Sequence, residues 1–251
     1  MIDQIKLAFG GVIYVDGGWS TLIDGLAGAA RAAGASLHTG ASVLAVTPEG
    51  AEIRISLADG KAMHADAALL ALGPQAASAL LPVASLEQAV RDAIPVRSNT
   101  LELGLERLPD GAETFVLGID QPLYMSVHSA AAKLAPPGGA VVHIARYLAP
   151  GEKPARAAIS ELEAYADAAM PGWRPLEQHR RRLIDMPVVS ALPRWDVKRP
   201  GVALGDAPGV FIAGDWVGDA GMMSDVSAAS AQAAAKAMLA HLSKKVRRAA
   251  A

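Results

Sequence analysis

The segment from residue 209 to residue 238 constrains the fold of this chain more than any other. An apolar run from Gly209 to Ala213 ends in Gly214-Asp215, and a glycine-containing loop then leads to an alanine-rich stretch that starts at Ser224-Asp225. This pattern predicts a buried strand, a tight loop and a helix. The order places a carboxylate beside a helix N-terminus, where glycine lets a ligand approach the backbone closely. On spacing alone, a ligand site and a plain Gly-Asp turn are equally good interpretations.

Residues 17–82 alternate between helix and strand patterns. Apolar residues with helical spacing run from Leu22 to Ala33, and Gly34 suits the position just after the helix. Ser20 or Thr21 can cap its start. Strands are then predicted at 36–38, 41–47, 51–57, 61–65 and 66–72, with a hairpin turn at Asp59-Gly60. The last of these strands is an uninterrupted apolar run, which is typical of a strand buried on both faces of a sheet.

The middle of the chain differs in character from the two ends. It carries short strands with alternating apolar and polar residues, one amphipathic helix over 155–170, and many prolines at the boundaries. This combination predicts a mostly antiparallel sheet with helices on one side. We therefore expect a mixed α/β chain in three parts, divided as 1–82, 83–205 and 206–251.

Composition excludes several classes of function. The net charge is −2 with charges interspersed, so nothing favours nucleic-acid binding. The chain has no cysteine, which excludes disulfides, thiolate nucleophiles and cysteine-ligated metals and is consistent with a cytoplasmic protein. The longest apolar runs fall far short of the ~20 residues that span a bilayer. Motifs of α/β-hydrolases and P-loop NTPases do not occur.

The charged and titratable residues do not form a metal site. The six histidines show no ligand spacing on one helix face, so no metal is expected. Arg180, Arg181 and Arg182 fall in a predicted strand, and a solvated edge or face is favoured over an anion site.

Three segments, in order, resemble the C-terminal portion of the FAD-dependent flavin amine oxidase and phytoene desaturase superfamily. The first, Tyr14–Leu22 with Leu26 and Gly34, resembles its Gly-Gly-x-x-x-Leu helix entry. The second resembles the hairpin and strand that complete the FAD-binding sheet, over 43–46, 57–60, 65–66 and 70–74. The third, 210–235, resembles the C-terminal Gly-Asp segment. The resemblance covers roughly residues 12–240.

This resemblance implies a fold, a reaction and a set of contacts. The fold is an incomplete Rossmann-like FAD-binding domain with an inserted β-rich substrate domain, and the reaction is hydride transfer from a C–N or C–C substrate to flavin. The cofactor contacts that it implies are Val43 at the adenine, Gly73 near the dinucleotide, Gly214 and Asp215 at the ribityl chain or pyrophosphate, and Met223, Ser224 and Asp225 beside the flavin ring. In the β-rich region, Tyr124, His128, His143 and Tyr147 are candidates for contact with a small apolar or amine substrate, or are ordinary strand residues.

The chain departs from the superfamily in one respect. The G-x-G-x-x-G fingerprint, which grips the cofactor's pyrophosphate, occurs nowhere in the 251 residues. We therefore expect FAD binding to be incomplete in this chain alone, with either a complementing N-terminal polypeptide or a truncated gene as the explanation. A sheet that lacks a strand exposes an edge, so self-association or a partner is also expected. The alternatives are a non-catalytic binding module and one subunit of a split flavoprotein.

Overall fold

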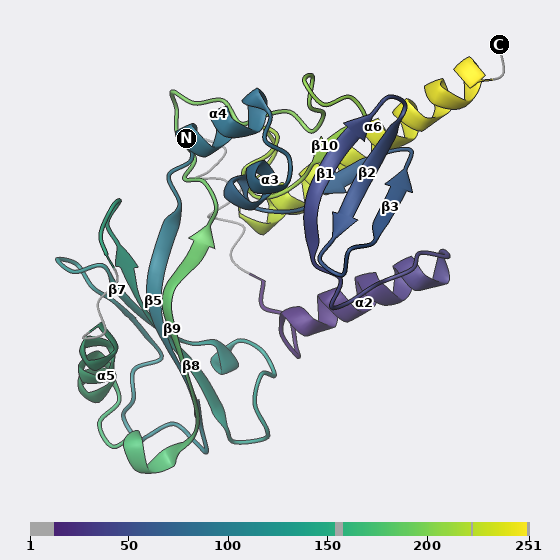
Figure 1. Cartoon of the computed structure of the whole chain (residues 1–251). Coiled ribbons are helices and arrows are strands. Elements are labelled where there is room, and N and C mark those ends of the chain that lie inside the picture. The colour runs from purple at the N-terminus through teal and green to yellow at the C-terminus, as the bar shows by residue number, and fades with distance from the viewer. Residues whose placement is uncertain (1–12, 154–157, 222, 250–251) are drawn as a thin grey trace. The chain divides into compact units, whose positions relative to one another are not determined.

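The computed structural model describes residues 13–153, 158–221 and 223–249, which form two compact units (Figure 1). Unit 1 contains residues 13–37 and 97–186, and unit 2 contains residues 38–96 and 187–249. The chain passes from one unit to the other between Val96 and Arg97 and again between Met186 and Pro187. The predicted three-part division at residues 82 and 205 stays a prediction.

Unit 1 is built on a five-stranded sheet. Its strands occur in the order β6-β7-β8-β5-β9, and the pairs β6–β7, β7–β8 and β5–β8 are antiparallel. The strands are β5 (Val96–Leu105), β6 (Phe115–Leu117), β7 (Leu123–Val127), β8 (Ala140–Leu148) and β9 (Glu177–Val189). Helix α5 (Ala158–Ala169) packs against β8, and two short 3-10 turns are η1 (His128–Ala130) and η2 (Arg174–Leu176). The predicted antiparallel sheet in the middle of the chain is confirmed.

The alternating pattern of β5 separates the two faces of this sheet. Leu101, Leu103 and Leu105 are buried and share a core with Leu162 and Trp173, which lie on and just after α5. The residues between these leucines, including Glu102, point to the opposite face, because successive side chains of a strand alternate. One face of the sheet therefore forms the hydrophobic core of unit 1, and the other carries its polar and aromatic side chains.

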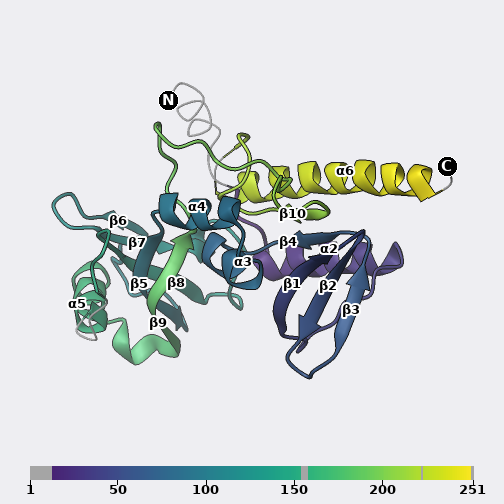
Figure 2. The same cartoon turned by 45° about the horizontal axis from the view of Figure 1, so that its top comes forward.

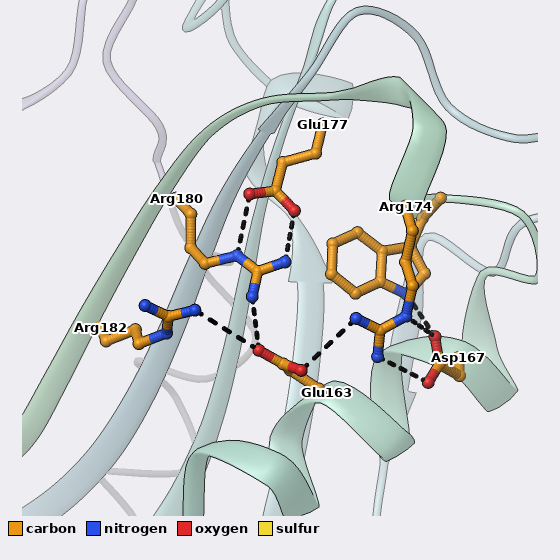
Figure 3. Close-up of polar contacts among 7 residues, drawn as sticks. Glu163, Asp167, Arg174, Glu177, Arg180 and Arg182 are labelled. Atoms are coloured by element: carbon orange, nitrogen blue, oxygen red, sulfur yellow. Dashed lines mark hydrogen bonds and ion pairs between the residues drawn. The ribbon is translucent and has the colours of Figure 1, made fainter.

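An ion-pair network joins α5 to the edge strand β9 (Figure 3). Arg180 pairs with Glu177 and Glu163, and Arg182 lies 3.8 Å from Glu163. Arg174 binds Asp167 at 2.9 Å. The guanidinium carbons of Arg174 and Arg180 lie 4.8 and 5.4 Å from the ring centre of Trp173, which is fully buried. The arginine run thus lies on an edge strand, as predicted, but its side chains are neutralised by acidic partners.

Helix α2 (Trp19–Ala32) confirms one sequence prediction and corrects two. Gly34 follows the helix with a φ of +90°, a conformation that glycine adopts without strain. The N-cap is Gly18, and Thr21 instead donates a hydrogen bond to the carbonyl of Asp16 at 2.8 Å, so the predicted Ser20 or Thr21 cap is wrong. The strand predicted at 36–38 does not form either, because these residues have no strand to pair with among those described.

Unit 2 contains two small sheets and three helices. Strands β1 (Val43–Glu49), β2 (Glu52–Leu57) and β3 (Ala62–Ala65) form an antiparallel meander, and β4 (Ala68–Leu70) pairs in parallel with β10 (Val210–Ile212). The helices are α3 (Pro74–Leu80), α4 (Ala84–Asp92) and α6 (Ser224–Ala249). Figure 2 shows α6 running beside β10. The mixed α/β class and the predicted start of the last helix at Ser224 are confirmed.

The apolar run of β4 predicted a strand buried on both faces, but the structure buries only one of them. Ala68 and Leu70 are buried, whereas Leu69 and Leu72 are 36% and 37% exposed. The run is apolar on both sides, but the described residues cover only one of them.

Among the helices that the structure describes, none is both long enough and apolar enough to cross a membrane.

Candidate functional site

The carboxyl ends of β4 and β10 meet at one edge of the parallel sheet in unit 2. The register aligns Ala68 with Val210 and Leu70 with Ile212, and the amide of Ala213 donates to the carbonyl of Leu70 at 3.1 Å. Gly73 follows β4 and Gly214-Asp215 follow β10, so the two segments emerge side by side. In open α/β sheets this edge is where ligands bind.

Gly214 is held in place by both strands' ends and by α6. Its φ is +156°, and a Cβ there would lie 2.9 Å from Nε1 of Trp216. That Nε1 donates to the carbonyl of Leu72 at 2.8 Å, and the amide of Gly214 donates to Oγ of Ser230 at 3.0 Å. The backbone beside Asp215 therefore depends on the absence of a side chain at residue 214.

Asp215 is oriented by a residue that the sequence did not indicate. Its Oδ2 accepts a hydrogen bond from the amide of Ser190 at 2.7 Å. The hydroxyl of Ser190 would lie 3.4 Å from a Cβ at Gly73. Ser190 thus lies between the two strand ends, although it is 25 residues away from Asp215 in sequence. Among the described residues, Oδ1 of Asp215 has no hydrogen-bond donor.

The N-terminus of α6 completes this edge. Ser224 and Asp225 are its first two residues, and both are exposed. Met223, just before them, is 62% exposed and has a φ of +53°. The side chain of Arg199 donates to the carbonyls of Gly218 at 3.4 Å and Gly221 at 3.3 Å, so it stabilises the loop before the helix. The free N–H groups of a helix's first turn favour negative charge.

Val43 lies apart from the strand ends, on the meander. It is the first residue of β1 and lines an apolar cavity of 790 Å³, together with residues of β2, β4 and α3. Leu72, the residue before Gly73, lines the same cavity. Val43 therefore shares a cavity with the residue before Gly73, and it packs against the core cluster that contains Leu70 and Ile212.

The four candidate substrate residues lie on the face of the unit 1 sheet opposite its hydrophobic core, which we name the open face. The register places Phe115, Ser126, His143 and Glu102 in one cross-strand row over β6, β7, β8 and β5. His128, just after β7, stacks on His143 with ring centres 4.1 Å apart, and its Nε2 lies 3.5 Å from the hydroxyl of Tyr124. Tyr147 lies two residues beyond Ala145, the partner of Tyr124, and so shares this face.

Burial of the two imidazoles favours their neutral forms. The pKa of His128 is lowered to about 4, mainly by burial and secondly by the neighbouring His143, against a smaller opposing effect of Glu102. Burial also lowers the pKa of His143. Nδ1 of His143 lies 3.3 Å from Glu102, whose other oxygen accepts a hydrogen bond from Arg181 at 2.6 Å. At neutral pH the uncharged ring of His143 can therefore donate a hydrogen bond from its Nδ1–H to Glu102.

Three further residues of this face were missed at the sequence level. Glu102 and Arg181 are ordinary charges on alternating strands, and only the pairing register brings them to His143. The ring of Tyr14 lies 5.1 Å from that of His128 and reaches the sheet from a segment more than a hundred residues earlier. Burial raises the pKa of Tyr124, so its hydroxyl stays protonated.

Within the described residues, no group of three or more histidine, aspartate or glutamate side chains could hold a metal ion.

Comparisons with known proteins give one family match in sequence and several similar folds. Residues 2–108 match the family described as flavin containing amine oxidoreductase. An oxidoreductase from Methanosarcina mazei shares the fold with a TM-score of 0.63 and 21% identity, over 88% of this chain and 55% of that one. A protein assigned as a protoporphyrinogen oxidase from Exiguobacterium sp. 255-15 gives a TM-score of 0.57 and 17% identity, over 79% of this chain and 46% of that one.

The resemblance to the flavin amine oxidase superfamily is therefore confirmed in sequence over residues 2–108. Over most of the chain, the fold is similar to that of the Methanosarcina mazei oxidoreductase. The chain spans about half the length of the solved structures that it matches. No curated protein sequence matches it.

Proposed function

We propose that this chain is the C-terminal portion of an FAD-dependent oxidoreductase, which transfers hydride from a C–N or C–C substrate to flavin. The observation that carries the proposal is the edge of the parallel sheet in unit 2. There Gly73, Gly214 and Asp215 lie at adjacent strand ends, next to the start of α6. The sequence match over residues 2–108 supports the same assignment.

The residues at this edge fit one part of an FAD molecule. Oδ1 of Asp215 can accept a hydrogen bond from a ribityl hydroxyl, because Oδ2 already binds Ser190. A side chain at residue 214 would occupy the space beside Trp216 and move the backbone that carries Asp215. The first turn of α6, with Met223, Ser224 and Asp225, would stabilise negative charge on a ligand placed before it. Bound FAD would supply the hydride acceptor.

The fit does not extend to the pyrophosphate. A glycine-rich turn that opens a helix usually holds that group, and no G-x-G-x-x-G occurs in these 251 residues. We therefore expect weak FAD binding by this chain alone. This mismatch favours a second candidate, in which the chain is one subunit of a split flavoprotein or a binding module without activity of its own.

The open face of unit 1 is our candidate surface for substrate contact. Tyr124, Tyr147 and the stacked pair His128–His143 present aromatic rings, and neither imidazole is charged at neutral pH. Such a surface suits a small apolar substrate or an amine, since it offers aromatic faces and hydrogen-bonding groups without a net positive charge. Glu102 would accept a hydrogen bond from the Nδ1–H of His143. This favours the tautomer whose Nε2 carries no hydrogen and can accept a hydrogen bond.

A visible absorption spectrum of the purified chain with added FAD tests the proposal. A protein-perturbed flavin spectrum is expected, weakened at least about tenfold in affinity in Asp215→Ala, because a hydrogen bond to a charged group contributes about 1.5–3 kcal/mol. Asp206→Ala is the matched control, since Asp206 also accepts the amide of a serine, Ser85, at 2.8 Å in unit 2. Equal weakening in both variants would contradict a role for Asp215 in binding FAD, whereas an unperturbed spectrum of the unaltered chain would favour the second candidate, a split flavoprotein or a module without activity of its own.

A further inference from the structure

One arginine of unit 1 points away from the ion-pair network of its neighbours in sequence. Arg180 and Arg182 pair with Glu163 on the core side of the sheet (Figure 3). Arg181 lies between them on β9, so its side chain projects to the open face, because successive side chains of a strand alternate. There its Nε donates a hydrogen bond to Glu102 at 2.6 Å, and the side chain is 60% exposed. Arg181 therefore brings a cationic group to the open face.

Arg181 also differs from other arginines of unit 1 in the number of its acidic partners. Arg146, Arg174 and Arg180 each pair with two carboxylates. Among the described residues, Arg181 pairs with Glu102 alone and only through Nε, and its two Nη groups have no acceptor. A guanidinium presents its donors as a planar fork that matches the two oxygens of a carboxylate. The Nη end of Arg181 is therefore a suitable partner for a second carboxylate.

The orientation of this fork is fixed by Glu102. One oxygen of Glu102 accepts the hydrogen bond from Arg181, and the other lies 3.3 Å from Nδ1 of His143. The Glu102 side chain is only 18% exposed. Because both oxygens of Glu102 are engaged, the carboxylate holds the Nε edge of the guanidinium and leaves the Nη end for a ligand.

Beside this charged group, the open face is aromatic and apolar. His143 stacks on His128 with ring centres 4.1 Å apart, and Phe115 meets Tyr124 edge to face at 5.7 Å. Phe115 lies on the edge strand β6 and is 59% exposed. Glu102 and Phe115 are the two ends of one row across four strands, and neighbouring strands are ~4.8 Å apart. The open face thus changes from charged to apolar across the sheet.

We propose that the open face binds a carboxylate that carries an apolar or aromatic body. The carboxylate would pair with the Nη groups of Arg181, and the body would lie across the two stacked imidazoles toward Phe115. This inference rests on the proposed function in one respect, since it narrows the substrate of that oxidoreductase to a molecule that bears a carboxylate. The binding itself does not require FAD.

Arg181 would then determine specificity without a net positive field. Its charge is balanced by Glu102, so the fork selects an acid by the geometry of two charge-assisted hydrogen bonds. An amine head group fits this end of the face less well, because the oxygens of Glu102 are already used by Arg181 and His143.

Three probes with the same body and different head groups test the proposal. Phenylbutyrate, phenylbutanol and phenylbutylamine are titrated into the full chain without FAD, and nuclear magnetic resonance follows the Nε–H of Arg181 and the ring of His143. We expect phenylbutyrate to shift both signals and to bind at least about tenfold more tightly than the alcohol, because hydrogen bonds between charged groups are the stronger ones. In Arg181→Gln this preference should disappear, whereas the affinity for the alcohol should stay the same.

Arg182→Gln is the matched control. Arg182 is the next residue of β9, its side chain is 54% exposed, and it has one acidic partner, Glu163, on the other face of the sheet. We expect this variant to keep the preference for the carboxylate. Equal loss in both variants would overturn the proposal, and so would an alcohol or amine that binds the unaltered chain as tightly as phenylbutyrate. If Arg181→Gln weakened all three probes alike, Arg181 would have only a structural role and the proposal would fail.

The flavin spectrum separates this inference from the proposed function. Selective binding of phenylbutyrate by a chain that does not perturb added FAD would support the carboxylate site and count against a flavoenzyme function of this chain alone. A perturbed flavin spectrum without any preference for the carboxylate would leave the proposed function intact and refute the carboxylate site.

Discussion

The five-stranded sheet of unit 1 and the parallel sheet of unit 2 differ in how much of their own stability the described residues provide. The five-stranded sheet of unit 1 buries one face under α5 and Trp173, and an ion-pair network holds its edge strand to that helix. The parallel sheet of unit 2 has two strands, one open edge and an apolar cavity beside it. The contrast teaches that the candidate cofactor site is placed on the less complete of the two sheets. The following experiments test that contrast.

The largest expected effect is in the core of unit 1. Trp173→Ala removes a fully buried ring and should lower the free energy of unfolding by about 3–5 kcal/mol. Leu69→Ala is its counterpart at the open edge in unit 2, and should cost about 1 kcal/mol or less. Urea unfolding followed by far-UV circular dichroism measures both. Equal losses would mean that Leu69 is as well packed as the core of unit 1.

The second largest effect is expected from the removal of one backbone hydrogen-bond donor. Ser190→Pro deletes the N–H that binds Asp215, and a hydrogen bond to a charged group is worth about 1.5–3 kcal/mol. Ser190→Ala keeps that N–H and removes the hydroxyl alone. We expect Ser190→Pro to weaken FAD binding in an equilibrium titration and Ser190→Ala to leave it nearly unchanged. If both variants weaken binding equally, the hydroxyl matters rather than the N–H, and if neither does, the hydrogen bond to Asp215 does not contribute to FAD binding; either result contradicts the proposed orientation of Asp215.

A methyl group at residue 214 should have a similar or smaller effect. Gly214→Ala places a Cβ 2.9 Å from Nε1 of Trp216, and forced repacking typically costs about 1–3 kcal/mol. In Gly205→Ala the added Cβ meets nothing within 4 Å. Thermal unfolding of the two variants compares a closely packed glycine with an open one. Equal melting temperatures would show that Trp216 moves aside without cost.

The smallest effect is electrostatic and lies in unit 1. In the unfolded chain the pKa of His128 is near its ordinary value of 6.5, whereas burial is the main cause that lowers this pKa to about 4 in the fold. Unfolding therefore takes up a proton between these values, so this residue's contribution to stability is present above pH 6.5 and is lost as the pH falls toward 4.

Nuclear magnetic resonance titration of the His128 ring measures this pKa directly. In His143→Gln the pKa of His128 should rise, because the charge of His143 is one of the causes of the lowering. Glu102→Gln should move it down instead, since that carboxylate raises it. A midpoint near 6.5 in the unaltered protein would show that the ring is not buried as described.

Local patterns in the sequence predicted much of the fold. The alternation of Leu101, Leu103 and Leu105 identified a half-buried strand, and Gly34 and Ser224 marked helix ends correctly, because these signals depend on neighbouring residues. Ser36 to His38 failed as a strand, since strand formation needs a partner. Leu69 failed as a buried residue for a related reason, because an apolar run does not show which of its faces will be covered.

The candidate site shows the same division between local and distant information. By itself, the sequence determined that Gly214-Asp215 end a strand before a helix, and that Tyr124 and His143 lie on strands. Only the tertiary structure decided that Ser190 binds Asp215, that Glu102 and Arg181 meet His143, and that β4 keeps an open edge. The physical reason is that chain spacing encodes local geometry, whereas contacts between distant residues depend on strand register and on which surfaces the rest of the protein covers.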